Sequence, residues 1–233
     1  KRGLTPETIE DFRLGYSPTN PEALRRHLID EGFSERDCLA SGLIRRREDS
    51  NATYPFFRSR LMIPIQDAHS DYLGFGARAL DDSTPKYINS PQSEIFEKGS
   101  GLYGMHRAKE AIREEGLAVV VEGYMDVLTA HQNGFRNVVA SMGTALTERQ
   151  VNSLKRLANT FVLAVDPDAA GDEATLRSLE SSWRVLKLLK NDCFWPPSES
   201  GLDGFPEGLR DQGEHSAAVA VVLAPLSSAG RGV

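Results

Sequence analysis

Two stretches decide the fold of this chain: Leu117-Ala118-Val119-Val120-Val121-Glu122-Gly123 and Phe161-Val162-Leu163-Ala164-Val165-Asp166-Pro167-Asp168. Each begins with a short apolar run typical of a buried strand and ends in carboxylates. In open α/β sheets, ligands bind outside the carboxyl ends of the strands. The two stretches therefore predict a parallel sheet with a metal site at one edge.

Strand and helix patterns alternate from residue 117 to about residue 186, which predicts a compact α/β unit with right-handed crossovers. Between the two stretches we expect a helix over about 124–133, a strand at Val138–Ala140 and a helix from Thr147 to Leu157. A further helix is expected from Asp172 to about 186. Thr147-Glu148-Arg149-Gln150 has the spacing of a capping box.

The residues before this unit predict a smaller α+β part. Helix starts are expected near residues 5, 20 and 34, where a capping residue stands before proline or acidic residues. Residues 61–65 and 72–79 predict a β-hairpin. The fold class is thus α/β: an α+β N-terminal subdomain over 1–115 and a mostly parallel, Rossmann-like sheet with flanking helices over 116–185. Residues 186–233 form an atypical tail of poor expected order, in which Ala217–Leu223 is apolar enough for a strand or a helix.

Composition narrows the class of protein. The chain has 233 residues, of which 40% are hydrophobic and 26% charged, as in soluble globular proteins. It has neither a signal peptide nor an apolar run of the roughly 18 residues that cross a membrane, so we expect no membrane partner. The only two cysteines, Cys38 and Cys193, suggest a reducing, cytoplasmic setting without a disulfide framework. A net charge of −6 excludes a uniformly basic nucleic-acid coat but not local basic patches.

Several basic residues cluster before the α/β unit. Arg58 and Arg60 precede one strand of the hairpin and Arg78 lies in the other, while Lys86, Tyr87 and Asn89 lie between two prolines. Lysine and arginine bind phosphate, tyrosine stacks and asparagine reads polar groups. A surface loop would explain the same segment, and the triple arginine at 45–47 is most simply a solvated face.

Gly74 and Gly76 alternate along the second hairpin strand. This spacing favours the close approach of a ligand or another backbone to one face. A twist or a bulge would explain the two glycines equally well.

The carboxylates carry the chemistry. Glu122, Asp166 and Asp168 end two strands, and Asp126 lies one helical turn after Glu122. Such a density of oxygen ligands suits Mg²⁺ or Mn²⁺, whose charge would offset the mutual repulsion of the carboxylates. Three alternatives are a calcium loop, an aspartyl-phosphate phosphatase and simple capping of a turn. Ala170 disfavours the first two, because it stands where each of those motifs needs another residue.

The motif Glu122-Gly123-Tyr124-Met125-Asp126, taken with Asp166-Pro167-Asp168, resembles the Toprim module. Further stretches look like the catalytic-core motifs of bacterial-type DNA primases, in that family's order. They are Phe57-Arg58-Ser59-Arg60-Leu61-Met62-Ile63-Pro64-Ile65, Gly74-Phe75-Gly76-Ala77-Arg78-Ala79-Leu80, Pro85-Lys86-Tyr87-Ile88-Asn89-Ser90-Pro91, Phe96-Glu97-Lys98-Gly99, Leu102-Tyr103-Gly104 and Val139-Ala140-Ser141-Met142-Gly143-Thr144-Ala145-Leu146-Thr147. The resemblance covers residues 1 to about 185.

This resemblance implies a nucleotidyltransferase that makes short RNA primers on single-stranded DNA during chromosome replication in the bacterial cytoplasm, near the nucleoid. It implies that Glu122, Asp166 and Asp168 bind catalytic Mg²⁺ or Mn²⁺, with Asp126 as a fourth catalytic residue. It also implies a surface for nucleotides, template and primer, formed by Arg58, Arg60, Arg78, Lys86, Tyr87 and Asn89. The implied partners are the single-stranded DNA template, the RNA primer and ribonucleoside triphosphates. The family's replicative helicase is expected to bind through a domain that is not in this sequence.

The sequence departs from the family in two ways. Pro167 stands where the family commonly has glycine, and the further acidic pair that follows another Toprim strand is not found. The resemblance ends near Trp183–Val185, so we expect an incomplete Toprim domain followed by a foreign or frame-shifted tail. The alternatives are a catalytically impaired fragment that binds single-stranded DNA, or another Toprim enzyme that cleaves DNA. The block from Arg58 to Pro91 disfavours a cleaving enzyme.

Overall fold

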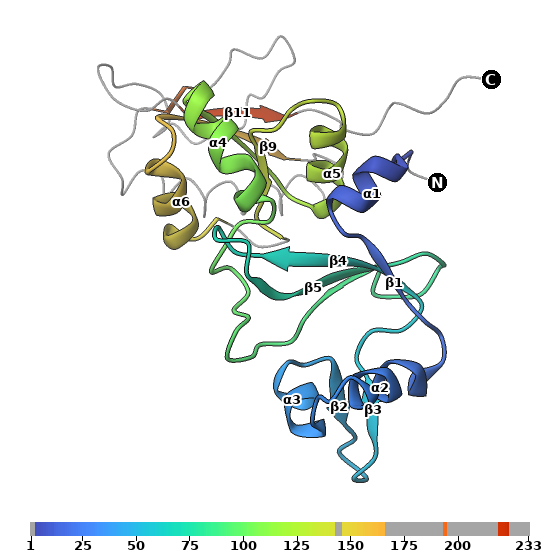
Figure 1. The fold of residues 1–233 in the computed structure, drawn as a ribbon. Coiled ribbons are helices and arrows are strands. Elements are labelled where there is room, and N and C mark those ends of the chain that lie inside the picture. Colours follow the sequence, from blue (N-terminus) through green and yellow to red (C-terminus); the bar gives the residue numbers. More distant parts are fainter. Residues whose placement is uncertain (1–2, 143–145, 166–192, 195–218, 224–233) are drawn as a thin grey trace, which may run out of the picture. The chain divides into compact units, whose positions relative to one another are not determined.

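The computed structural model describes residues 3–142, 146–165, 193–194 and 219–223. Two compact units make up the chain, Lys1–Lys98 and Gly99–Val233 (Figure 1). The domain boundary expected after residue 115 remains a prediction. No helix in the described part of the chain is long and apolar enough to cross a membrane.

The first unit begins with three short helices whose starts are fixed by local capping. Thr5, Asn20 and Ser34 each accept a hydrogen bond from a backbone N–H of the first turn, which confirms the three predicted helix starts. At Ser34 the box is reciprocal, because Asp37 accepts a hydrogen bond from the Ser34 backbone. The helices are α1 (Pro6–Asp11), α2 (Pro21–Asp30) and α3 (Glu35–Ala40).

Two antiparallel sheets complete this unit. One has four strands in the order β1-β4-β5-β6, and the other is a two-stranded ribbon, β2-β3. The predicted hairpin is β4 with β5, and their register is irregular at Ile65 and Gln66, opposite Gly74. The strands are β1 (Gly15–Ser17), β2 (Ile44–Arg46), β3 (Thr53–Pro55), β4 (Arg60–Gln66), β5 (Tyr72–Ala79) and β6 (Tyr87–Asn89).

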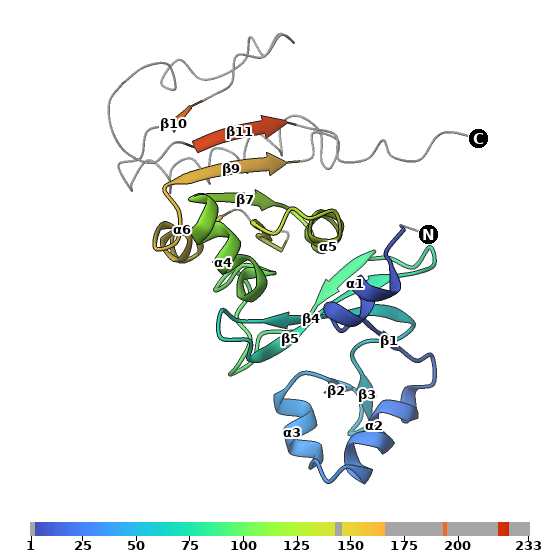
Figure 2. The same cartoon turned by 45° about the horizontal axis from the view of Figure 1, so that its top comes forward.

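The second unit contains the predicted parallel sheet. Its strand order is β10-β11-β9-β7-β8, and every neighbouring pair is parallel (Figure 2). The strands are β7 (Leu117–Val121), β8 (Val138–Ala140), β9 (Thr160–Val165), β10 (Cys193–Phe194) and β11 (Val219–Leu223). The described helices are α4 (Met105–Glu115), α5 (Tyr124–Gln132) and α6 (Glu148–Lys155). The helix expected from Asp172 to about 186 lies outside the described residues.

The apolar segment near the end of the chain forms a strand rather than a helix. Residues of β11 pair with β9 along its length, from Val219 opposite Phe161 to Leu223 opposite Val165. Part of the predicted tail therefore extends the sheet, and the β7–β9 pair is flanked on both sides.

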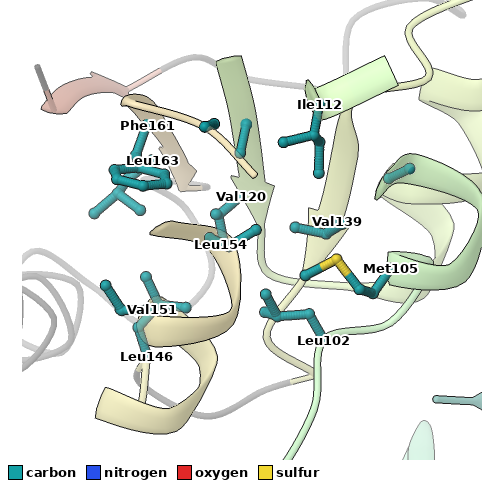
Figure 3. Packing of buried hydrophobic residues seen from close by; sticks show 13 residues of the cluster. Leu102, Met105, Ile112, Val120, Val139, Leu146, Val151, Leu154, Phe161 and Leu163 are labelled. Carbon is teal, nitrogen blue, oxygen red and sulfur yellow. The ribbon is translucent and has the colours of Figure 1, made fainter. Parts of the chain in front are cut away.

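The core of the second unit lies between this sheet and two helices. α4 contributes Met105 and Ile112, and α6 contributes Val151 and Leu154 (Figure 3). They pack on side chains from the central strands, among them Val120, Val139, Phe161 and Leu163. Burial of apolar side chains stabilises this arrangement and holds β7 and β9 firmly side by side.

Candidate functional site

Glu122 lies directly after β7, in the turn that leads into α5. The turn is closed by Asp126, whose Oδ2 accepts a hydrogen bond from the Gly123 N–H at 3.1 Å. Tyr124, which follows Gly123, is buried and packs edge-to-face against Tyr103, with ring centroids 4.8 Å apart. Desolvation raises the pKa of both tyrosines, so both rings stay neutral and pack as part of the interior. The half-buried Glu122 carboxylate is therefore presented by a rigid turn.

β9 is the parallel neighbour of β7, with Val120 opposite Leu163. The carboxyl ends of parallel neighbours lie at the same edge of a sheet. Asp166 and Asp168 follow Val165, the last residue of β9, and lie outside the described residues. Among the residues that the structure describes, no three acidic, histidine or cysteine side chains gather into a metal-binding cluster. The ligand set of Glu122, Asp166 and Asp168 stays a prediction.

Arg78 and Tyr87 lie opposite one another on β5 and β6. The Arg78 Cζ atom is 5.5 Å from the centroid of the Tyr87 ring, a cation–π contact. Arg78 Nε is buried and has no hydrogen-bond partner within the described part of the chain. A buried donor without an acceptor is costly, by about 1–3 kcal/mol, and such donors are candidates for contact with a ligand. Tyr87 is 40% exposed, so this pair reaches the surface.

The remaining basic candidates divide into exposed and interior residues. Arg58 and Lys86 are exposed, and Asn89 is half-buried. Arg60 is only 9% exposed, and its Nη1 donates a hydrogen bond to the Lys86 carbonyl oxygen at 3.3 Å. The same oxygen accepts the Ala79 N–H at 2.8 Å. Arg60 thus fixes the segment that carries Lys86, a role that the sequence did not reveal.

Gly74 is required by a close neighbour. A Cβ at this position would lie 2.8 Å from Ser90 Oγ and 3.3 Å from Phe96 Cδ2. Ser90 Oγ in turn accepts the Phe75 N–H at 2.9 Å, which ties β5 to the residue after β6. The close neighbours are side chains rather than the ligand or backbone that the spacing favours, and the glycine lies opposite the β4–β5 irregularity, as the alternative of a bulge predicts. Ser90 was missed because nothing in its local sequence marks the contact.

Two family models match successive parts of the chain. A family model described as the N-terminal domain of the DNA primase catalytic core matches residues 1–109, and a Toprim domain model matches residues 116–193. The DNA primase of Deinococcus radiodurans is 45% identical over 215 residues, covering 90% of this chain and 38% of the relative. The chain belongs to the DNA primase family.

Solved primase structures have the same fold. A primase domain from Pseudomonas aeruginosa matches with a TM-score of 0.74 and 35% identity, covering 97% of this chain and 62% of that one. A DnaG primase catalytic domain bound to single-stranded DNA matches with a TM-score of 0.68 and 36% identity, covering 78% and 56%. The chain spans 38%, 30% and 27% of the first three curated primases that it matches.

The similarity to primases also extends further than the sequence motifs indicated. Ninety per cent of the chain aligns with the Deinococcus radiodurans primase, which is more than residues 1–185 can supply. The expectation of a foreign or frame-shifted tail after residue 185 stays a prediction, because the next two relatives align over only 77% of the chain. Within the described residues, Val219–Leu223 of this tail forms β11, which pairs with β9 in parallel. A short strand in a sequence poor in motifs carries little local signal.

Proposed function

We propose that this chain is the catalytic core of a DNA primase, a nucleotidyltransferase that joins ribonucleotides into short RNA primers on a single-stranded DNA template. The observation that carries the proposal is the parallel pairing of β7 with β9. From the carboxyl ends of these two strands the chain continues into Glu122 and into Asp166. Membership of the primase family supports the same conclusion.

Glu122, Asp166 and Asp168 would together hold Mg²⁺ or Mn²⁺. Carboxylate oxygens are the donors that these hard cations prefer, and a turn fixed at Gly123 suits a ligand that must not move. When bound, such an ion neutralises phosphate charge and lowers the pKa of the attacking hydroxyl. Asp126 already uses one oxygen on the Gly123 N–H, so we assign it to positioning Glu122.

In the proposed reaction, the 3′-hydroxyl oxygen of the primer forms a bond to the α-phosphorus of a ribonucleoside triphosphate. The bond from that phosphorus to the departing pyrophosphate breaks, and the hydroxyl proton is released. Exposed Arg58 and Lys86 would neutralise phosphates of the template, primer or nucleotide. Arg78 would donate its unpaired Nε–H, and Tyr87 and Asn89 would contact bases or sugars. Arg60 would act indirectly, by holding the Lys86 segment.

The partners follow from this reaction. A template of single-stranded DNA is supported by the solved DnaG primase catalytic domain that binds it. The RNA primer and the ribonucleoside triphosphates follow from the reaction type. A replicative helicase partner and a place in the bacterial cytoplasm remain predictions.

Primer synthesis by the 233-residue chain tests the proposal. The assay supplies single-stranded DNA, ribonucleotides and Mg²⁺, and measures dinucleotides and longer products. Because loss of a group that merely supports a metal ligand costs about 10–100-fold, Glu122→Gln and Asp168→Asn should each lower synthesis at least about 100-fold. Binding of labelled (dT)20 should stay within twofold. Glu110→Gln is the matched control, since this exposed carboxylate pairs with Arg113 at 3.1 Å and is not among the proposed ligands.

Three outcomes would overturn the proposal. Unchanged synthesis in the Glu122→Gln variant would remove the metal-ligand assignment. A parent chain that binds (dT)20 but makes no dinucleotide would be an impaired single-strand-binding fragment. Cleavage of supercoiled DNA without primer synthesis would instead indicate a DNA-cleaving Toprim enzyme.

A further inference from the structure

Three consecutive arginines that the proposed site does not use lie in the last two residues of β2 and the residue that follows it. Arg45 lies opposite Tyr54, and Arg46 lies opposite Thr53. Opposite residues of an antiparallel pair share one face of the ribbon, and neighbours along a strand alternate between faces. Arg45 and Arg47 therefore lie on one face and Arg46 on the other. We name the first the outer face, and define it as Arg45, Arg47, Tyr54 and Phe56.

The inner face belongs to the packing of the first unit. Ile44 and Pro55 are buried there, and α2 and α3 pack against the two strands. Arg46 Nη2 lies 3.6 Å from Glu35 Oε1, and Arg25 Nη2 lies 3.4 Å from the other oxygen of the same carboxylate. The charge of Arg46 is therefore compensated, and this arginine is explained by structure alone.

The outer face is different because its cations are stacked rather than ion-paired. Arg45 Cζ lies 5.7 Å from the centroid of the Phe56 ring, and Arg47 Cζ lies 5.7 Å from that of Tyr54. Both arginines are exposed, both rings are half-buried, and neither arginine forms an ion pair within the described residues. A guanidinium held over a ring keeps its N–H donors free for a planar anion.

We propose that the outer face is a further contact surface for single-stranded nucleic acid, with the two arginines on successive phosphates and the two rings against bases. Alternation of cations with aromatic rings matches a strand that alternates phosphates with bases. An acidic peptide would satisfy the arginines and leave the rings without partners. Glu48 and Asp49 are exposed, follow Arg47 in the turn, and would repel a phosphate at the turn. We therefore expect the nucleic acid to contact the part of the outer face that carries the rings. The proposal adds a template-binding surface to the proposed function. It rests on that function for the identification of the nucleic-acid strand as the DNA template.

The ribbon offers a matched pair of variants. The Arg45→Gln/Arg47→Gln double variant should weaken binding of fluorescent (dT)20 to the full chain about tenfold or more at 50 mM salt. Loss of two phosphate contacts should also reduce the slope of log K against log salt by about 1.4. Arg46→Gln removes one charge from the same strand. Because Arg46 lies on the opposite face and is paired with Glu35, this variant should change affinity less than twofold. Tyr54→Leu should weaken (dT)20 but not an abasic oligonucleotide of the same length.

Unchanged (dT)20 affinity in the double variant would overturn the proposal, and so would an equal loss of affinity in Arg46→Gln. A third contrary result would be that poly-glutamate of matched charge binds as tightly as (dT)20 and depends on the same two arginines. The last would identify an acidic polypeptide as the partner. The binding assay needs no catalysis, so failure here leaves the proposed function standing. Conversely, a chain without primer synthesis can still bind (dT)20 through this face. Circular dichroism tests whether each variant is folded. If Tyr54→Leu does not fold, the arginine variants alone decide the question.

Discussion

Replacing Gly74 by alanine should disturb the junction between β5 and β6. The added Cβ would lie 2.8 Å from Ser90 Oγ and 2.9 Å from Ser90 Cβ, closer than unbonded side-chain atoms approach. Ser90 is only 7% exposed, so its side chain has little room to turn away. Its Oγ also accepts the Phe75 N–H at 2.9 Å, and rotation would break that hydrogen bond. The strain must therefore move the backbone after β6 or Phe96, which lies 3.3 Å from the added atom.

The cost follows from these contacts. Overpacking a filled interior costs about 1–3 kcal/mol, and losing the hydrogen bond costs about 1 kcal/mol more. The free energy of unfolding of the first unit should thus fall by about 2–4 kcal/mol. For a unit of about 100 residues this lowers the midpoint of thermal unfolding by roughly 10–20 °C. Because β6 also carries Tyr87 and Asn89, (dT)20 affinity should fall in the folded variant as well.

Thermal unfolding followed by circular dichroism measures the change, and hydrogen exchange of β5 and β6 peptides assigns it to the first unit. Gly101→Ala is the matched control, because an added Cβ there meets no atom within 4 Å. The cause is tested by adding Gly74→Ala to a Ser90→Gly background, which removes both of the closest atoms. In that background, Gly74→Ala should lower the free energy of unfolding by less than about 1 kcal/mol, which is the size of one lost hydrogen bond. A midpoint within 2 °C of the parent, or the same loss in both backgrounds, would refute the steric argument.

Three further changes have definite expected results. Gln150→Leu should destabilise the second unit by about 1–3 kcal/mol in urea unfolding, because the fully buried side chain donates to the Gly101 carbonyl at 2.7 Å; an unchanged midpoint would contradict this. Arg60→Lys should speed hydrogen exchange in the segment before β6 and weaken (dT)20 binding, since lysine cannot reproduce the guanidinium contact; unaltered exchange would exclude the positioning role. Hydrogen bonds from Ser34 hold the pKa of Asp37 below its usual value of 3.8, so its contribution to stability is present above about pH 4 and is lost as pH falls through the lowered pKa. Asp37→Asn should therefore reduce the drop in thermal midpoint between pH 6 and pH 3, and an identical drop would rule out this linkage.

Much of the fold could be predicted because its signals are local. The apolar runs of β7 and β9 and the capping residues Thr5, Asn20, Ser34 and Thr147 each act within a few residues. The place of Glu122 could be predicted for the same reason, since it directly follows a strand. The position of β11 could not, because five apolar residues carry no information about which strand they join. Ser90 and Arg60 were equally invisible, since each acts across strands on a residue distant in sequence.

The arginines show why charge alone could not locate the nucleic-acid surface. Arg46 is compensated by a carboxylate, and Arg60 is an interior residue that holds a loop. Arg78 stacks on a tyrosine, and its buried Nε–H has no hydrogen-bond partner among the described residues. Arg45 and Arg47 stack on rings and form no ion pair in that same part of the chain. The same side chain thus has three different roles, and strand register decides which one it takes, because a shift of one residue moves it to the opposite face. A carboxylate that directly follows a strand needs no such information, so the place of Glu122 after β7 could be predicted from the sequence, whereas the ligand set of Glu122, Asp166 and Asp168 stays a prediction.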